Sequence, residues 1–156
     1  MAKLKTPKLK IAIGSDHAGF QTKQMLAEFL EKSGFDVVDF GTHSEERADY
    51  PDYAKRVAKA VAAGKCDKGV LACGTGIGMS ITANKVKGIR AAAPWSVATA
   101  KLASEHNWAN VLCVPSRFVS GSGIKKIVMA WLKTPPETGG RHERRIKKIR
   151  DLELNR

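Results

Sequence analysis

The chain has 156 residues, 43% of them hydrophobic, and a formal net charge of +12. This length favours one domain with a sizeable core, and the apolar runs are too short for a membrane span or a secretion leader, so we expect a cytoplasmic protein that binds no membrane. Residues 1–10 and 141–150 hold +4 and +5 of the charge and leave a nearly balanced centre without interleaved aromatic residues, which argues against nucleic acid binding.

Short apolar runs alternate with amphipathic stretches along most of the chain. In chain order, the pattern predicts a strand over 9–14, a helix over 21–32, a strand over 35–40, a helix over 54–62, a strand over 70–73, a helix over 78–86, a strand over 89–93, a helix over 97–105, a strand over 110–114 and a helix over 124–132. Parallel strands need such helical crossovers. We therefore predict an α/β fold with a five-stranded parallel sheet covered on both faces.

The two ends differ from this core. Residues 1–8 are predicted to form a basic flexible arm, and the Pro- and Gly-rich stretch 135–140 a linker that ends the domain of residues 9–134. Beyond the linker, residues 141–152 have the pattern of a charged helix, whose apolar positions Ile146, Ile149 and Leu152 are too few for firm packing on its own domain. We expect residues 135–156 to form a linker and an interface helix that reaches a second subunit.

The most informative segment is the glycine-rich turn of residues 73–78, which directly follows the apolar strand 70–73. Backbone N–H groups of such a turn face the carboxyl edge of a sheet, where they form an anion site. The thiol of Cys73 lies at its lip, and the positive field of a helix N-terminus favours a thiolate that can act as a base. Neither this turn nor residues 14–19 has the spacing of a nucleotide-binding loop. The alternative is a turn whose glycines serve only backbone geometry.

Four other candidate side chains lie next to predicted strands, two after the first strand and two before the fifth. Asp16 and His17 follow the first strand and are expected to face Cys73, although a capping aspartate with a surface histidine is the alternative. His106 and Asn107 end the helix before the fifth strand, where a histidine can also serve as a charge partner of the helix C-terminus.

Three arginines supply phosphate-binding chemistry. Arg117 follows the fifth strand, and Arg141 and Arg145 share one face of the last predicted helix, for which a solvated basic face is the alternative. Three cysteines without a pairing motif indicate reduced thiols, and no zinc spacing is present. A thiol base, two histidines, an oxyanion nest and arginines together favour metal-independent proton transfer next to the carbonyl of a phosphorylated small molecule.

A series of collinear motifs resembles the RpiB/LacAB family of sugar-phosphate isomerases. The resemblance runs from about residue 9 to residue 152 and rests on residues 15–20, 41–42, 49–51, 73–78, 83–85, 88–91, 105–107, 110–112 and 139–142, with Arg145. It implies a Rossmann-like α/β/α sandwich in a homodimer or tetramer with shared active sites. It also implies cofactor-free interconversion of aldose and ketose phosphates through a cis-enediolate, in carbohydrate metabolism and the pentose phosphate pathway.

The resemblance further implies a role for each candidate residue. Cys73 would move the proton between C2 and C1, and His106 would open the sugar ring. The enediolate oxygens would be bound by the Thr75 hydroxyl and by backbone N–H groups of the turn, those of Gly74, Gly76, Ile77 and Gly78. The sugar and phosphate would contact Asp16, His17, Asn107 and Arg117, with Arg141 and Arg145 donated to the phosphate by the neighbouring subunit.

Two places differ from the usual family pattern. Trp108 replaces an acidic residue, and residues 93–97 replace a more polar stretch. Both lie near the predicted sugar site and bear on substrate preference, since family members act on ribose, allose, galactose or tetrose phosphates. We expect ribose 5-phosphate as the substrate, with allose 6-phosphate, galactose 6-phosphate or a tetrose 4-phosphate as alternatives. The competing class of function is a non-catalytic basic binding module.

Overall fold

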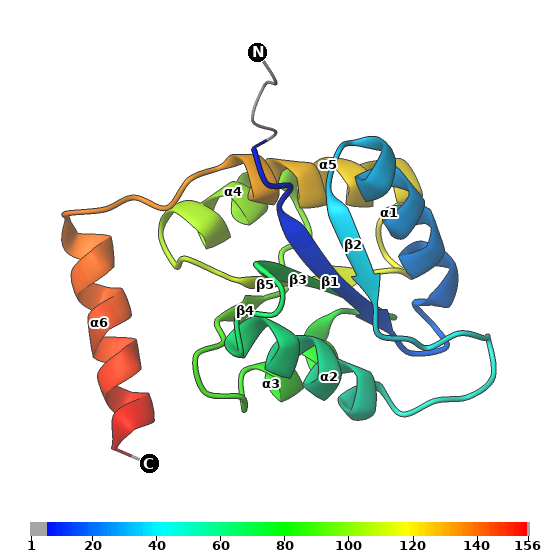
Figure 1. Cartoon of the computed structure of the whole chain (residues 1–156), viewed down its shortest axis with the longest axis horizontal. Helices are drawn as coiled ribbons and strands as arrows, with labels where there is room; N and C mark the ends of the chain where they lie inside the picture. Colours follow the sequence, from blue (N-terminus) through cyan, green and yellow to red (C-terminus); the bar gives the residue numbers. More distant parts are fainter. Residues whose placement is uncertain (1–5, 156) are drawn as a thin grey trace.

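Five parallel strands form one sheet in the order β2-β1-β3-β5-β4 (Figure 1). The computed structural model describes residues 6–155. The strands are β1 (Lys10–Ser15), β2 (Asp36–Asp39), β3 (Lys68–Cys73), β4 (Ala91–Ala92) and β5 (Val111–Pro115). The helices are α1 (Phe20–Lys32), α2 (Tyr50–Ala62), α3 (Ile77–Ala83), α4 (Val97–Glu105), α5 (Gly121–Lys133) and α6 (Arg141–Leu154). The predicted α/β fold with a five-stranded parallel sheet is confirmed.

Helices cover both faces of the sheet because its central strands are apolar on both sides. In β1, Ile11 and Ile13 point to the face covered by α1, α4 and α5, whereas Ala12 points to the face covered by α2 and α3. All three side chains are fully buried. This continuous apolar run is typical of a parallel strand enclosed between two helical layers.

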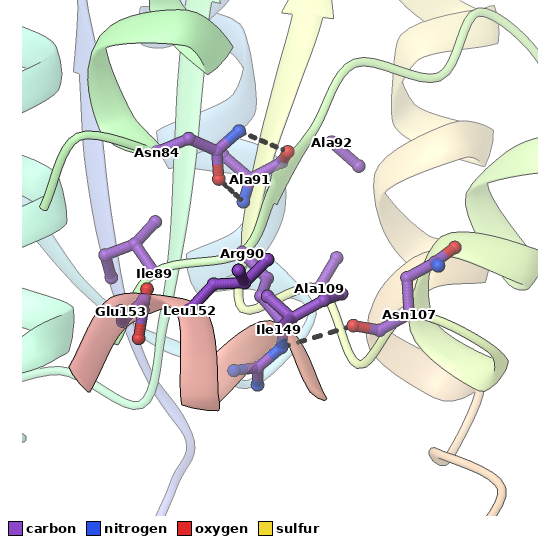
Figure 2. A pocket seen from close by; sticks show the side chains of 10 residues that line it. All are labelled: Asn84, Ile89, Arg90, Ala91, Ala92, Asn107, Ala109, Ile149, Leu152 and Glu153. Atoms are coloured by element: carbon purple, nitrogen blue, oxygen red, sulfur yellow. Dashed lines mark hydrogen bonds between the residues drawn. The ribbon is translucent and has the colours of Figure 1, made fainter. Parts of the chain in front are cut away.

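The edge strand β4 is shorter than the predicted strand 89–93. Its outer side has no neighbouring strand among the described residues, and the side chain of Asn84 binds there instead. The Asn84 amide donates to the Ala91 carbonyl (3.0 Å) and accepts from the Ala91 N–H (2.8 Å), as Figure 2 shows. This side chain takes the place of a neighbouring strand and satisfies both backbone groups of Ala91 on the outer side of the edge.

The last helix contacts its own chain at a few positions and leaves much of its apolar side exposed. Figure 1 shows α6 at one side of the molecule, joined to α5 by an extended segment. Ile146 is only 1% exposed, and the Glu153 carboxylate accepts from the Gly88 N–H (3.2 Å). Ile149 and Leu152 stay largely exposed and line a cavity of about 390 Å³ between α6 and β4 (Figure 2). Contact of α6 with a second subunit stays a prediction.

Most of the predicted basic arm lies outside the described residues, which begin at residue 6, and residues 6–8 are exposed and outside helices and strands. None of the helices in the described part of the chain is long and apolar enough to cross a membrane.

Candidate active site

Three strands end at the same edge of the sheet and bring the predicted turn together with two other loops. The register places Ser15 of β1 beside Ala72 of β3, and Cys73 beside Pro115 of β5. The loops that follow these strands, together with the first residue of α2, line a cavity of about 240 Å³, which we call the thiol pocket. Its lining residues are Asp16, His17, Ala18, Tyr50, Cys73, Gly74, Thr75, Gly78 and Arg117.

Cys73 is held in a turn that depends on a glycine. Its Sγ atom accepts a hydrogen bond from the Gly76 N–H at 3.1 Å, and the residue is 5% exposed. Gly76 has a φ of 80°, and a Cβ added there would lie 3.1 Å from the Cys113 carbonyl oxygen. A side chain at this position would therefore strain the backbone and press on β5. The turn therefore aims a backbone donor at the sulfur.

The Thr75 hydroxyl also binds within the turn. Its oxygen accepts from the Ile77 N–H at 3.1 Å, which leaves the hydroxyl proton for another acceptor. Two of the N–H groups assigned by resemblance to the enediolate, those of Gly76 and Ile77, are thus bonded to side chains of the turn itself.

Asp16 and His17 enter the pocket from the loop after β1. The Asp16 carboxylate is buried and accepts from the Gly19 N–H (3.0 Å), so the capping alternative is also present in the structure. Gly19 is required here because a Cβ would lie 2.2 Å from the Ala72 carbonyl oxygen. Nδ1 of His17 lies 3.2 Å from both the N–H and the carbonyl oxygen of Ala48, and the tautomer decides which of them it binds; in either case Nε2 is the ring nitrogen available to a ligand.

Arg117 lies on the β5 side of the turn of residues 73–78, which we call the cysteine turn. Its backbone N–H donates to the Gly74 carbonyl (3.1 Å), and its guanidinium lies 3.3 Å from where a Gly74 Cβ would be. The missing side chain at Gly74 lets this cation approach the turn. Tyr50, to which sequence reasoning gave no role, lies where a Gly78 Cβ would come within 2.7 Å of its ring. Its only signal in the sequence is membership of the 49–51 motif.

A second group of polar side chains, which we call the histidine cluster, consists of His106, Glu137, Arg141 and His142. The rings of His106 and His142 stack with centroids 3.9 Å apart and planes 5° from parallel. Arg141 Nε donates to His142 Nε2 (3.4 Å), and a Glu137 carboxylate oxygen lies 3.7 Å from the same nitrogen. Burial, with further contributions from His106 and the nearby arginines, lowers the pKa of His142 below its usual value.

Part of this cluster has the composition of a metal site. The donor atoms of His106, Glu137 and His142 lie within 4.8 Å of one another, and two histidines with a carboxylate suit zinc. The imidazole rings are parallel, however, so their nitrogen lone pairs do not converge on one point. Arg141 already donates to one of these nitrogens. The arrangement therefore suits a stacked pair better than a coordination site.

The thiol pocket and the histidine cluster are separate within one chain. Neither His106, Asn107, Arg141 nor Arg145 lines the thiol pocket. A helix that follows a strand runs back to the amino ends of the strands. His106 and Asn107 come between α4 and β5, so they lie at the opposite edge of the sheet from Cys73. The start of α6 lies on the side where β1 begins (Figure 1).

Comparisons with known proteins agree with this architecture. A family model described as Ribose/Galactose Isomerase matches residues 11–149. Ribose-5-phosphate isomerase B of Escherichia coli (strain K12) is 48% identical over 147 residues, which cover 94% of this chain and 98% of that protein. The structure of Clostridium thermocellum ribose-5-phosphate isomerase B has a TM-score of 0.91 at 48% identity and covers 94% of this chain and 99% of that one. The Mycoplasma genitalium ribose-5-phosphate isomerase B with bound ribulose-5-phosphate has a TM-score of 0.91 at 45% identity, covering 97% and 100%.

Proposed function

The chain belongs to the Ribose/Galactose Isomerase family and is a sugar-phosphate isomerase, and we propose that it interconverts ribose 5-phosphate and ribulose 5-phosphate. The two solved relatives named above are ribose-5-phosphate isomerases, and one holds ribulose-5-phosphate. The observation that carries the proposal is the hydrogen bond from the Gly76 N–H to the Cys73 sulfur inside a pocket at the carboxyl edge of the sheet.

In the proposed mechanism, Cys73 is the general base. Its thiolate takes the proton from C2 of the open-chain aldose, and the resulting thiol returns that proton to C1 of the cis-enediolate. The Gly76 N–H supports the negative sulfur before the transfer. The Thr75 hydroxyl, whose oxygen is fixed by the Ile77 N–H, donates a hydrogen bond to the enediolate oxygens and keeps its proton. The proton on O2 of the cis-enediolate passes to O1, so C2 becomes the carbonyl as C1 takes up the proton from the thiol. The transfer needs only groups that the chain supplies, so chelation by EDTA should leave turnover unchanged.

The cationic and polar groups of the thiol pocket are proposed to bind the rest of the substrate. Arg117 lies against the cysteine turn and supplies a cation for the phosphate. His17 offers its Nε2 atom, because Nδ1 binds the backbone of residue 48. Asp16 is buried at the pocket wall and contacts the sugar while it holds the start of α1. These groups lie on loops fixed by β1 and β5, so they are pre-organised for one substrate orientation.

The remaining site residues are proposed to come from a second copy of the chain. His106 would open the sugar ring, Asn107 would hold its hydroxyls, and Arg141 with Arg145 would bind the phosphate. All four lie at the edge of the sheet opposite Cys73 or on α6, so the same chain does not bring them to its own thiol pocket. In a two-fold dimer, each thiol pocket would face the histidine cluster of the partner. Residues 135–156 would then act as linker and interface helix, attached to the domain of residues 9–134.

A panel of sugar phosphates tests the substrate. We expect the highest kcat/KM with ribose 5-phosphate among ribose 5-phosphate, allose 6-phosphate, galactose 6-phosphate and erythrose 4-phosphate. The Cys73→Ala variant, measured in parallel, controls for contaminating isomerases. A higher kcat/KM with a hexose or tetrose phosphate would contradict the proposed substrate and keep the reaction class. Absence of turnover with all four would contradict the proposal as a whole.

A further inference from the structure

Three successive carbonyl groups of the cysteine turn are held by hydrogen bonds from outside the turn. The Cys73 carbonyl accepts from the Ser116 N–H (2.9 Å), and the Gly74 carbonyl accepts from the Arg117 N–H (3.1 Å). Both donors are backbone groups that follow β5. The third carbonyl, that of Thr75, accepts from a side chain instead, the indole Nε1–H of Trp95 at 3.2 Å. The last bond is therefore the one that a substitution can remove without changing the backbone.

The peptide unit held by Trp95 is also the unit that donates to the catalytic sulfur. Its carbonyl belongs to Thr75 and its N–H belongs to Gly76, which donates to Cys73 Sγ at 3.1 Å. A peptide unit is planar, and in the trans form its C=O and N–H point in opposite directions, so fixing one fixes the other. Hydrogen bonds at the two ends of one amide also strengthen each other. Trp95 thus acts on the sulfur through a single rigid group.

The indole is itself held from several sides. Pro94 before it is buried, and Ser96 after it accepts from the Thr99 N–H (3.2 Å) as the N-cap of α4. The ring stacks on Phe118 with centroids 5.0 Å apart and an angle of 18°. Trp95 and Phe118 are nevertheless 45% and 60% exposed, so burial in the core does not explain their positions. The position of this tryptophan is better explained by its bond to the turn.

We propose that Trp95 is a positioning residue for Cys73, which orients and polarises the Thr75–Gly76 peptide so that its N–H stabilises the thiolate. The kinetic consequence rests on the proposed function, because it requires Cys73 to be the base. Trp95 lies in the 93–97 segment, which differs from the usual family pattern near the predicted sugar site. The structure connects that segment to the reactivity of the base.

The test compares Trp95→Phe with Trp131→Phe. Each variant loses one indole N–H and keeps an aromatic ring, and the Trp131 Nε1–H binds the Ala109 carbonyl (3.0 Å) in the core beneath α5. The rate of Cys73 alkylation by iodoacetamide is followed against pH, with labelled peptides identified by mass spectrometry because Cys66 and Cys113 are also free thiols. In Trp95→Phe we expect the midpoint of the profile to rise by about half a pH unit. Trp131→Phe should give the wild-type profile, and a wild-type profile for Trp95→Phe would overturn the proposal.

A third variant separates the hydrogen bond from the aromatic stack. Phe118→Leu removes the stacking partner and keeps the Trp95 N–H, so it should shift the profile less than Trp95→Phe does. An equal or larger shift would assign the effect to packing and overturn the proposed role. With ribose 5-phosphate, Trp95→Phe should lower kcat about threefold and leave KM near its wild-type value. The alkylation profile does not depend on turnover. If the wild-type enzyme fails to isomerise the sugar, that result counts against the proposed function and not against the role of Trp95.

Discussion

The thiol pocket and the histidine cluster are built in opposite ways. The pocket lies where strands end, and backbone groups and glycines close to each other in sequence hold its sulfur. The cluster lies where a helix ends, and long side chains from α4, the linker and α6 form it. A parallel sheet keeps these edges apart in one chain. A reaction that needs groups of both types is therefore best served by two copies, each contributing one region.

Removal of the thiol should have the largest effect. Loss of a general base lowers turnover by about 10² to 10⁴, so Cys73→Ala should lose that much in kcat. Cys66→Ala is the matched control, because Cys66 is buried away from the pocket and burial raises the pKa of its thiol. It should keep wild-type turnover. Comparable turnover in the two variants would show that the pocket lacks the base.

Substitution of Gly76 in the cysteine turn should have the next largest effect. It tests how far the thiol pocket depends on backbone geometry. Gly76→Ala and Gly64→Ala both place a side chain at positive φ, 80° and 71°, which costs about 1–2 kcal/mol of unfolding free energy. Gly64 has open space around it, whereas an added Cβ at Gly76 meets the Cys113 carbonyl at 3.1 Å. Urea unfolding should therefore give the greater loss for Gly76→Ala. Only this variant should also lose turnover, about tenfold, because the N–H moves away from Cys73.

Acid should weaken the histidine cluster and leave the cysteine turn intact. We expect this effect to be smaller than those of the Cys73 and Gly76 substitutions. Burial and then His106 lower the pKa of His142, so the unfolded chain binds a proton more readily than the folded one. The stabilising contribution of neutral His142 is complete above about pH 6.5 and is lost as the pH falls further. His142→Phe keeps a ring against His106 but takes up no proton. Its Tm should fall less than that of the wild type between pH 7.5 and pH 5.5; equal falls would contradict this account.

Local patterns predicted the fold and the thiol pocket well, because strand ends and glycine turns are neighbours in sequence. Helix 97–105 was predicted with its observed bounds, and Asp16, His17 and Arg117 were expected at the pocket that they line. Residues that meet through tertiary contacts were missed. Ile146 is buried against its own chain, and the His142 ring stacks on that of His106, which is far from it in sequence. Tyr50 lines the pocket through its approach to Gly78, which apolar periodicity does not encode.

The proposed division of the active site between two chains can be measured by subunit complementation. Cys73→Ala is defective in the thiol pocket, and Arg141→Ala is defective on α6, so each alone should be inactive or nearly so. When the two variants are unfolded together, refolded and shown by mass spectrometry to form mixed dimers, one site of each mixed dimer should be intact. Random mixing should then restore about a quarter of the wild-type turnover of ribose 5-phosphate. Turnover no higher than that of the separate variants, with mixed dimers present, would contradict a site shared between the thiol pocket of one chain and the histidine cluster of another.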